Sequence, residues 1–400
     1  MLYSHPVKKK PLSLYVHIPF CERRCDYCDF TSFDDCASQI PSYLDALCSE
    51  IADYGLRCKQ HRVETIFFGG GTPSLLSVAQ ITKLMSCLRS CFNIDKAAEV
   101  TIECNPESLT QKKLEAYLGL GINRISIGIQ STNPITLQTL GRVHTPERAM
   151  RAVGLASMAG FENINIDIMY NVPISRELSE GNLRRNLAAE LHNILGANPW
   201  VTHISAYSTT VASGTELARR LDYEELYELD DESCIEEELD LLYVLKDFGF
   251  NRYEVSNFAR KGFECKHNRN YWTARVEYLG LGLGASGLFN GERYENTDNI
   301  NMYLLNPNKV TTREVRSLHD CVNEAILLGL RTKQGVSIKR LEELGVNILA
   351  GKAKELMELK SHNLIRVTKD SIKPTKDGSF VLNAIIERLL FDKEEISGTI

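Results

Sequence analysis

The sequence has no long run of apolar residues and only a small excess of charge. No apolar stretch approaches the about 20 residues that a helix needs to cross a bilayer. Lys8–Lys10 are followed by only a short apolar run broken by Pro19, which is unlike a signal peptide. The net charge of −6 gives no basis for non-specific nucleic-acid binding. We therefore expect a cytoplasmic protein that binds no nucleic acid and meets a membrane only through a partner.

Cysteine, by contrast, is abundant, with 12 residues in 400. Cytosolic thiols stay mostly reduced, so a tight group of them indicates metal or redox chemistry rather than disulfides. Cys21, Cys25 and Cys28 form such a group, while the other cysteines are scattered, and most of them are expected to be small buried hydrophobic residues. Pro19 and the charged residues 22–24 favour a loop here over one sulfur-rich face of a helix.

The spacing C-x3-C-x2-C suits a [4Fe–4S] cluster. Such a cluster has four irons, and each iron is normally ligated by one cysteine thiolate. Three cysteines therefore leave one iron open to a small molecule that offers an amine and a carboxylate, which is the logic of radical S-adenosylmethionine (SAM) chemistry. A zinc site is the alternative, with His17 as the fourth ligand that structural zinc normally requires.

Short β-branched and aromatic runs alternate with helical patterns over the first 200 or so residues. Such βα repeats build parallel sheets. We predict an α/β fold with a partial (β/α)6 barrel, and a doubly wound sheet is the alternative. The predicted strands are Leu12–Ile18, Val63–Phe68, Val100–Cys104, Arg124–Ile129, Ile164–Met169 and His203–Tyr207, and helical stretches between them are Ile40–Gln60, Val78–Phe92 and Pro146–Ala159.

The remainder of the chain divides into two parts. From about Leu318 short amphipathic helices carry basic residues, and residues 362–378 predict a small hairpin. We predict a C-terminal helical, winged-helix-like module without the dense basic stripe of a DNA-binding domain. The predicted domains are a barrel core over 1–220, an extension over 221–310 that contains an H-N-x-x-Y-W sequence, and the C-terminal module over 311–400.

Polar residues and glycines fall where the predicted strands end, and barrel enzymes place their sites at this rim. A triple glycine lets the backbone approach the charged end of SAM, because no Cβ is in the way. Polar side chains nearby can bond to ribose, adenine and carboxylate. The candidates are Gly69, Gly70, Gly71, Glu103, Asn105, Gln130, Arg142, Asp167 and Tyr207.

Several motifs, in order, carry a resemblance: "YVHIPFCERRCDYCDF", "FFGGGTPSLL", "TIECNPESL", "RISIGIQS", "LGRVH" and "INIDIMYNVP". From about Leu12 to its C-terminus the chain resembles the oxygen-independent coproporphyrinogen III oxidase family, a radical SAM family with a barrel domain. The resemblance implies cluster ligation by Cys21, Cys25 and Cys28. It implies SAM contacts by Tyr15, Tyr27, Gly70, Gly71, Glu103, Gln130, Arg142 and Asp167.

Two features favour one branch of that family. The oxidases carry a fourth cysteine two positions after the third, where this sequence has Phe30. The sequence also contains His267-Asn268-x-x-Tyr271-Trp272, a motif typical of the heme chaperone branch, HemW. The resemblance implies that His267 binds heme. Imidazole is a common axial ligand, and we hypothesise that Cys265 is a second or competing ligand.

The leading interpretation is thus a radical SAM protein that binds heme and delivers it to heme-requiring respiratory enzymes at the membrane. A homodimer is a candidate assembly. One alternative is the oxygen-independent coproporphyrinogen III oxidase itself, which would turn propionate side chains into vinyl groups by oxidative decarboxylation. Another is a radical SAM enzyme acting on an unrelated substrate, because a barrel rim supports many chemistries.

Overall fold

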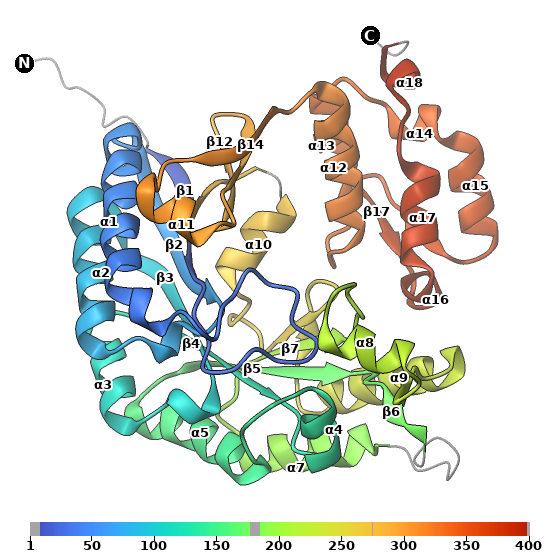
Figure 1. The fold of residues 1–400 in the computed structure, drawn as a ribbon. Helices are drawn as coiled ribbons and strands as arrows, with labels where there is room; N and C mark the ends of the chain where they lie inside the picture. The colour runs from blue at the N-terminus through green and yellow to red at the C-terminus, as the bar shows by residue number, and fades with distance from the viewer. Residues whose placement is uncertain (1–8, 177–184, 274, 398–400) are drawn as a thin grey trace, which may run out of the picture.

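A computed structural model describes residues 9–176, 185–273 and 275–397 (Figure 1). One large sheet curls into a partial barrel, with helices packed on its outer face. A smaller helical domain follows at the C-terminal end of the chain. No helix in the described ranges is long and apolar enough to cross a membrane.

Six parallel strands form the centre of the barrel sheet, as predicted. They are neighbours in chain order, which confirms the partial barrel and excludes the doubly wound alternative, whose strand order reverses. The strands are β1 (Lys10–Ile18), β2 (His61–Gly70), β3 (Ile94–Cys104), β4 (Arg124–Gln130), β5 (Asn163–Tyr170) and β7 (His203–Ser208).

Residues beyond position 220 complete this sheet at both edges. A seventh parallel strand, β11 (Glu277–Leu281), pairs with β1, although the sequence did not predict it. β12 (Ser286–Phe289), β13 (Glu292–Asn296) and β14 (Val310–Val315) continue antiparallel from it. At the other edge β10 (Asn257–Ala259) pairs antiparallel with β7 and with β9 (Asn251–Arg252). A separate ribbon joins β6 (Ile174–Ser175) to β8 (Leu226–Tyr227).

Local signals set the helix ends. Ser77 and Gln80 form a capping box at the start of α2, and α5 runs from the N-cap Thr145 to Gly160, whose φ of 105° ends it. The helices of the barrel domain are α1 (Ile40–Arg57), α2 (Val78–Cys91), α3 (Gln111–Gly119), α4 (Pro134–Thr139), α5 (Pro146–Ala159), α7 (Leu187–Ala197), α8 (Glu216–Asp222), α9 (Asp231–Asp247), α10 (Lys266–Thr273) and α11 (Ile300–Leu305).

The two faces of the barrel strands differ in chemistry. Along β4 and β5 the isoleucines belong to the hydrophobic core, whereas most of the alternate positions carry polar residues, which point the other way. Among these, Asn165 accepts a hydrogen bond from His203 (Nδ1–Oδ1, 2.6 Å) and donates to Ser126 (Nδ2–Oγ, 2.6 Å). His203 Nε2 is 2.8 Å from the Tyr253 hydroxyl. The barrel interior therefore contains a buried polar network on β4, β5 and β7.

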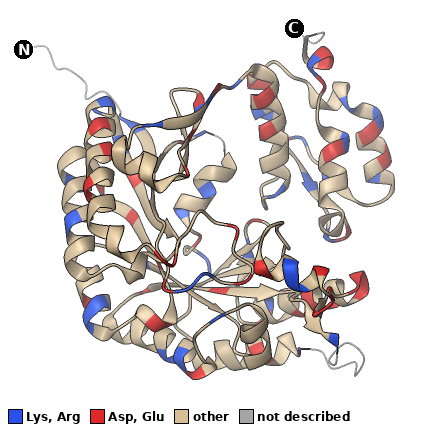
Figure 2. Ribbon diagram, viewed as in Figure 1, with Lys and Arg blue, Asp and Glu red and all other residues tan. Residues whose placement is uncertain are grey.

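The C-terminal domain has its own hydrophobic core, which includes Val322, Leu341, Ile372 and Leu389. The predicted hairpin is confirmed, with β16 (Ile365–Val367) and β17 (Ser371–Pro374) antiparallel and β15 (Val336–Ser337) beside β17. Its helices carry both charge signs (Figure 2). They are α12 (Leu318–Leu330), α13 (Ile338–Glu343), α14 (Ile348–Gly351), α15 (Ala353–Ser361), α16 (Lys376–Phe380), α17 (Leu382–Leu389) and α18 (Lys393–Ser397).

Candidate functional site

The three clustered cysteines lie on the segment between β1 and α1, which we call the cluster loop (residues 19–33). Residues 21–28 contain no helix, so the alternative of a helical cysteine face is wrong. Backbone hydrogen bonds from Cys21 to Phe33 (N–O, 2.9 Å) and from Phe33 to Pro19 (N–O, 2.7 Å) close the loop at its base. The loop is thus a folded unit that presents its thiols together.

All three cysteines line one cavity of about 330 Å³ at the carboxyl ends of the strands, which we call the barrel cavity. Seven of the eight residues predicted to contact SAM line the same cavity. They are Tyr27, Gly70, Gly71, Glu103, Gln130, Arg142 and Asp167. Phe30, at the position of the oxidases' fourth cysteine, lies at this cavity too and is 60% exposed.

The donor set fits a cluster better than a single zinc ion. Among the described residues no three His, Cys, Asp or Glu side chains are arranged to hold one metal ion. Three thiols around a shared cavity instead suit a cluster that spreads them over separate irons. His17 is not available as a fourth ligand, because its Nδ1 is 3.0 Å from the Tyr15 hydroxyl and its Nε2 is 2.8 Å from the Thr31 carbonyl oxygen.

The glycine turn after β2 forms one wall of the barrel cavity. Gly70 has a φ of 112°, and a Cβ there would lie 2.5 Å from the His17 ring, so only glycine fits. Its N–H donates to Glu103 Oε2 at 3.2 Å. Burial and the nearby Asp167 raise the pKa of Glu103 to about 8. A carboxyl group that holds its proton more tightly than an exposed one therefore faces the cavity beside the glycine backbone.

Arg142 connects the cluster loop to the strands. Its Nη1 donates to the Cys25 sulfur at 3.2 Å, and its Nη2 donates to Asn105 Oδ1 at 3.0 Å and to the Gly128 carbonyl at 2.8 Å. A cation beside a thiol stabilises the thiolate, which is the form that binds iron. Arg142 thus both positions the loop and favours ligation.

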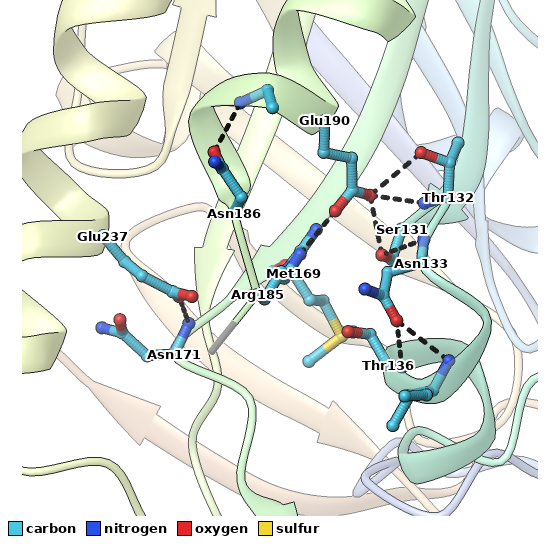
Figure 3. Close-up of polar contacts among 12 residues, drawn as sticks. Ser131, Thr132, Asn133, Thr136, Met169, Asn171, Arg185, Asn186, Glu190 and Glu237 are labelled. Atoms are coloured by element: carbon cyan, nitrogen blue, oxygen red, sulfur yellow. Dashed lines mark hydrogen bonds and ion pairs between the residues drawn. The ribbon is translucent and has the colours of Figure 1, made fainter. Parts of the chain in front are cut away.

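Gln130 is held in an unusual backbone conformation by neighbours that the sequence did not reveal. Its φ is 61°, a left-handed value that strains a residue with a side chain. The following turn is fixed by Glu190 of α7, which accepts hydrogen bonds from Ser131 Oγ (2.7 Å) and from the Thr132 N–H (2.5 Å). Glu190 is also paired with Arg185 at 2.6 Å, and both side chains are buried (Figure 3).

This buried pair is electrostatically well matched. Burial alone would raise the pKa of Glu190, but Arg185 and the donors of the turn hold it below its usual value. Arg185 Nη1 also donates to the Met169 carbonyl oxygen at 2.5 Å, at the end of β5. The pair therefore joins the ends of β4 and β5, and it positions Gln130 although neither Arg185 nor Glu190 is in the lining of the barrel cavity.

Arg220 of α8 also stabilises the site, through the cluster loop, and the sequence analysis did not predict it. Its Nη1 donates to Asp26 of the cluster loop (Oδ2, 3.2 Å) and to the Thr139 carbonyl oxygen (3.0 Å). The Asp26 backbone N–H also donates to the Leu140 carbonyl oxygen, at 3.1 Å. No local motif marks Arg220, because its partner lies 194 positions earlier in the chain.

A buried carboxylate, Glu50, stabilises the segment after β11 that packs on the cluster loop. Glu50 of α1 accepts hydrogen bonds from the Gly282 N–H (2.8 Å), Asn296 Nδ2 (2.8 Å) and the Tyr303 hydroxyl (2.7 Å). Burial raises its pKa to about 7. The glycine run after β11 packs on the loop, since a Cβ at Gly284 would lie 3.0 Å from Thr31.

Tyr15, the eighth predicted SAM residue, is not in the lining of the barrel cavity. Its ring stacks on Phe67 inside the barrel, with centroids 6.3 Å apart. The other stacking partner of Phe67 is His267, at 5.1 Å. Tyr15 and His267 thus belong to an aromatic layer within the barrel.

His267 is buried, with 1% of its surface exposed, and both ring nitrogens have partners. Nδ1 is 2.8 Å from the Thr65 hydroxyl and Nε2 is 2.7 Å from the Tyr271 hydroxyl. A neutral imidazole has one N–H and one lone pair, and burial followed by the charge of Arg124 lowers the pKa of His267 to about 3. In this conformation the histidine has no free lone pair for an iron.

Cys265 is also enclosed. It is fully buried, its sulfur is 3.3 Å from Glu99 Oε1, and burial raises the pKa of its thiol to about 12. Glu99 also accepts the backbone N–H groups of Lys266 and His267, each at 3.0 Å, at the start of α10. A carboxylate at a helix N-terminus is stabilising. These contacts fasten α10 to the barrel, and they leave Cys265 as well as His267 without an open side for heme.

A partial barrel with three loop cysteines around a cavity at its mouth defines a radical SAM protein. The Radical SAM superfamily model matches residues 15–177, and the HemN C-terminal domain model matches residues 317–381. The solved structure of coproporphyrinogen III oxidase HemN from Escherichia coli aligns with a TM-score of 0.83 over 96% of this chain and 91% of that chain. At 22% identity this likeness shows the fold alone.

Curated relatives define the family more narrowly. The heme chaperone HemW of Lactococcus lactis is 32% identical, covering 96% of this chain and 98% of its own. HemW of Bacillus subtilis is 31% identical, covering 94% and 99%. The chain belongs to the HemW family of radical SAM proteins, as its motifs predicted. This membership implies a [4Fe–4S] cluster and SAM as cofactors.

Proposed function

We propose that this protein binds heme and delivers it to heme-requiring respiratory enzymes, with a [4Fe–4S] cluster and SAM held at the barrel mouth. The observation that carries the proposal is the near full-length similarity to proteins named heme chaperones. The recipients at the membrane follow from the family resemblance.

The barrel cavity supplies the residues that would hold the cluster and SAM. Cys21, Cys25 and Cys28 would each ligate one iron and leave the fourth open. The Gly70 backbone and the Glu103 carboxyl group would meet the amine of SAM, and the Arg142 cation would meet its carboxylate. When bound, the cluster would supply an electron to the sulfonium of SAM. The buried supports Glu190 and Arg220 would keep these groups in place.

Phe30 favours the chaperone over the oxidase. Its ring occupies the position where the oxidases carry a further thiol, and it presents an exposed apolar surface at the mouth of the cavity. A phenyl ring offers neither a ligand nor a hydrogen-atom donor of the thiol kind. We therefore expect no turnover of coproporphyrinogen III.

Two experiments test the proposal. In the first, purified protein with its cluster is titrated anaerobically with heme and followed by its Soret band. We expect saturable binding at one heme per chain, and the absence of a saturable Soret change would refute heme binding. The same titration of His267→Ala and Cys265→Ala tests the predicted ligands. An unchanged spectrum in both variants would remove these side chains from the heme site.

In the second experiment the protein is incubated anaerobically with SAM, a low-potential reductant and coproporphyrinogen III. The heme chaperone proposal predicts no protoporphyrinogen above the level of a control lacking SAM. Catalytic formation of protoporphyrinogen would instead identify the oxidase.

A further inference from the structure

A chain of side-chain hydrogen bonds runs through the barrel interior and ends at the barrel cavity. Asn165 of β5 and His203 of β7 are opposite each other on paired strands, and His203 Nδ1 is 2.6 Å from Asn165 Oδ1. On one side, His203 Nε2 is 2.8 Å from the Tyr253 hydroxyl. On the other side, Asn165 Nδ2 is 2.7 Å from Asp167 Oδ1. Asp167 lines the barrel cavity, whereas the other three residues lie outside its lining.

The far end of this chain lies at the contact with the C-terminal domain. Tyr253 follows β9, and its carbonyl oxygen accepts the Lys333 N–H at 3.0 Å. The next residue, Glu254, forms an antiparallel bridge with Thr332, and both Thr332 and Lys333 follow α12. Main-chain contacts with the C-terminal domain therefore fix Tyr253, while its hydroxyl reaches into the barrel.

The chemistry of the members sets the direction of every hydrogen bond in the chain. A carboxylate only accepts, so the Asn165 amide nitrogen faces Asp167 and its oxygen faces His203. Burial, followed by the charge of Arg124, lowers the pKa of His203 well below its usual value, so the ring is neutral. With one N–H and one lone pair, His203 donates from Nδ1 and accepts the Tyr253 hydroxyl at Nε2. Each donor is thus directed toward Asp167.

Two serines support the same direction. Ser205 Oγ donates to Asn165 Oδ1 at 3.3 Å, and Ser126 Oγ accepts from Asn165 Nδ2 at 2.6 Å. Ser126 Oγ is also 3.3 Å from Asp167 Oδ1 and 3.4 Å from Oδ2. Asn165 and His203 have no exposed surface, so bulk water does not supply these donors. The short hydrogen bond to Oδ1 leaves Oδ2 as the oxygen with more capacity to accept from a ligand.

Charged and titratable groups surround Asp167. Burial raises the pKa of Asp167, while the hydrogen bonds from Asn165 and the two serines, together with the charge of Arg124, oppose the rise. Hydrogen bonds to a carboxylate favour its charged form. The titratable groups of the barrel cavity that interact with the Asp167 charge are Tyr27, Glu103, Cys104 and Tyr207.

We propose that Asn165, His203 and Tyr253 are positioning residues that hold Asp167 as an oriented hydrogen-bond acceptor for SAM in the barrel cavity. The proposal rests on the proposed function, which places SAM at this cavity, and it names residues that prepare one of the contacts. A carboxylate with one oxygen held by protein donors keeps one orientation and presents the other oxygen to N–H and O–H groups of the ligand. Because Tyr253 belongs to the domain contact, that contact contributes to SAM affinity without bordering the cavity.

The test measures SAM affinity over a range of pH values, by anaerobic equilibrium dialysis of the full-length protein with its reconstituted cluster. Asn165→Leu and His203→Leu break the chain, and Tyr253→Phe removes its first donor. His203→Asn is the rescue variant, because its amide N–H replaces the N–H at Nδ1. Tyr117→Phe is the matched control, since this tyrosine of α3 is fully buried but lies outside both the chain and the cavity lining.

Asn165→Leu is expected to weaken SAM binding by about tenfold, the scale of a lost hydrogen bond to a charged group. The acid limb of its affinity profile should move to higher pH by about one unit, because Asp167 loses a donor that favours its charged form. His203→Leu should act in the same direction, and His203→Asn should restore most of the affinity. Tyr253→Phe should weaken binding by about threefold, and Tyr117→Phe should match the wild type.

Unchanged SAM affinity and an unchanged pH profile in Asn165→Leu, His203→Leu and Tyr253→Phe would overturn the positioning role. A loss that is equal at every pH and is not rescued by His203→Asn would reveal a merely structural effect and would overturn it as well. Tyr253→Phe and His203→Asn are conservative changes, so they keep the test valid if a leucine variant fails to fold. Absence of SAM binding by the wild type would instead overturn SAM binding at the barrel cavity, so the two failures are distinguishable.

Discussion

The barrel mouth and helix α10 both carry motifs that stand out in the sequence, but the fold uses them differently. At the mouth, the three cysteines come from one loop and reach one cavity. On α10, His267 faces the barrel interior and Trp272 faces the C-terminal domain. A loop can direct all its ligands to one place, whereas a helix distributes neighbouring residues around its axis. A motif on a helix therefore does not have to be a single site.

The largest expected effect that distinguishes the barrel mouth from helix α10 comes from removing one cysteine thiol at the mouth. Cys25→Ser should abolish the cluster, since a cubane held by three thiolates loses one of its few protein bonds. Iron and sulfide analysis after anaerobic reconstitution should fall from about four of each per chain toward zero. Cys36→Ser is the control, because Cys36 is close in sequence but outside the cavity lining. Full iron and sulfide content in Cys25→Ser would refute ligation by this cysteine.

Removing the support of the mouth should have the next largest effect. Glu190→Gln leaves Arg185 buried without its counter-charge and should cost about 3 kcal/mol of unfolding free energy. Because Glu190 fixes the turn after Gln130, SAM affinity should fall as well. Urea unfolding and equilibrium dialysis with SAM measure the two effects. The control Glu216→Gln breaks an exposed pair with Arg219 and should change neither. Equal stability of the two variants would contradict the supporting role.

The buried carboxylate behind the cluster loop predicts a pH effect. The pKa of Glu50 is about 7 when folded and about 4.5 when exposed. Between these values the folded state binds more protons than the unfolded state, so its stability falls as pH rises. The loss should reach about 3 kcal/mol above pH 7. Glu50→Gln cannot ionise and should lack this loss.

Urea unfolding at pH 5 and pH 8 measures the Glu50 effect as the difference between wild type and variant. All other titratable groups are common to the two proteins, so their contribution to the pH dependence cancels. An identical pH dependence in the two proteins would show that Glu50 does not carry the effect.

The smallest expected effect lies on α10. Tyr271→Phe removes the hydroxyl beside His267 Nε2 and should lower the unfolding free energy by about 1–3 kcal/mol. Iron and sulfide content should be unchanged, because Tyr271 is not in the lining of the barrel cavity. Tyr243→Phe, at an exposed position, is the control for loss of a hydroxyl. Loss of the cluster in Tyr271→Phe would show that the two regions are not separate.

Much of the fold could be predicted because its signals are local. The six central strands are short β-branched runs that alternate with amphipathic helices, and every one is present. β11 escaped prediction because it is short and runs directly into the glycines at positions 282 and 284, which resemble a loop, and because its partner β1 lies far away in the sequence. The hairpin of the C-terminal domain was predictable from its turn residues.

The residues of the candidate site also fall into those that the sequence could predict and those that it could not. The cysteines and the strand-end polar residues could be found from spacing and from their place after each strand. Glu190, Arg220 and the closure of His267 could not, because each depends on a contact between distant segments. Thr65 and His267, for example, are 202 positions apart. Long-range pairing of this kind leaves no local pattern.

The most direct test asks whether heme binding depends on the cluster at the barrel mouth. Heme is titrated anaerobically into the wild type and into a variant in which Cys21, Cys25 and Cys28 are all serine, with folding verified by circular dichroism. We predict that the variant lacks iron and sulfide yet binds heme with unchanged affinity and stoichiometry. Loss of heme binding together with the cluster would show that heme binding depends on the cluster and would contradict this prediction.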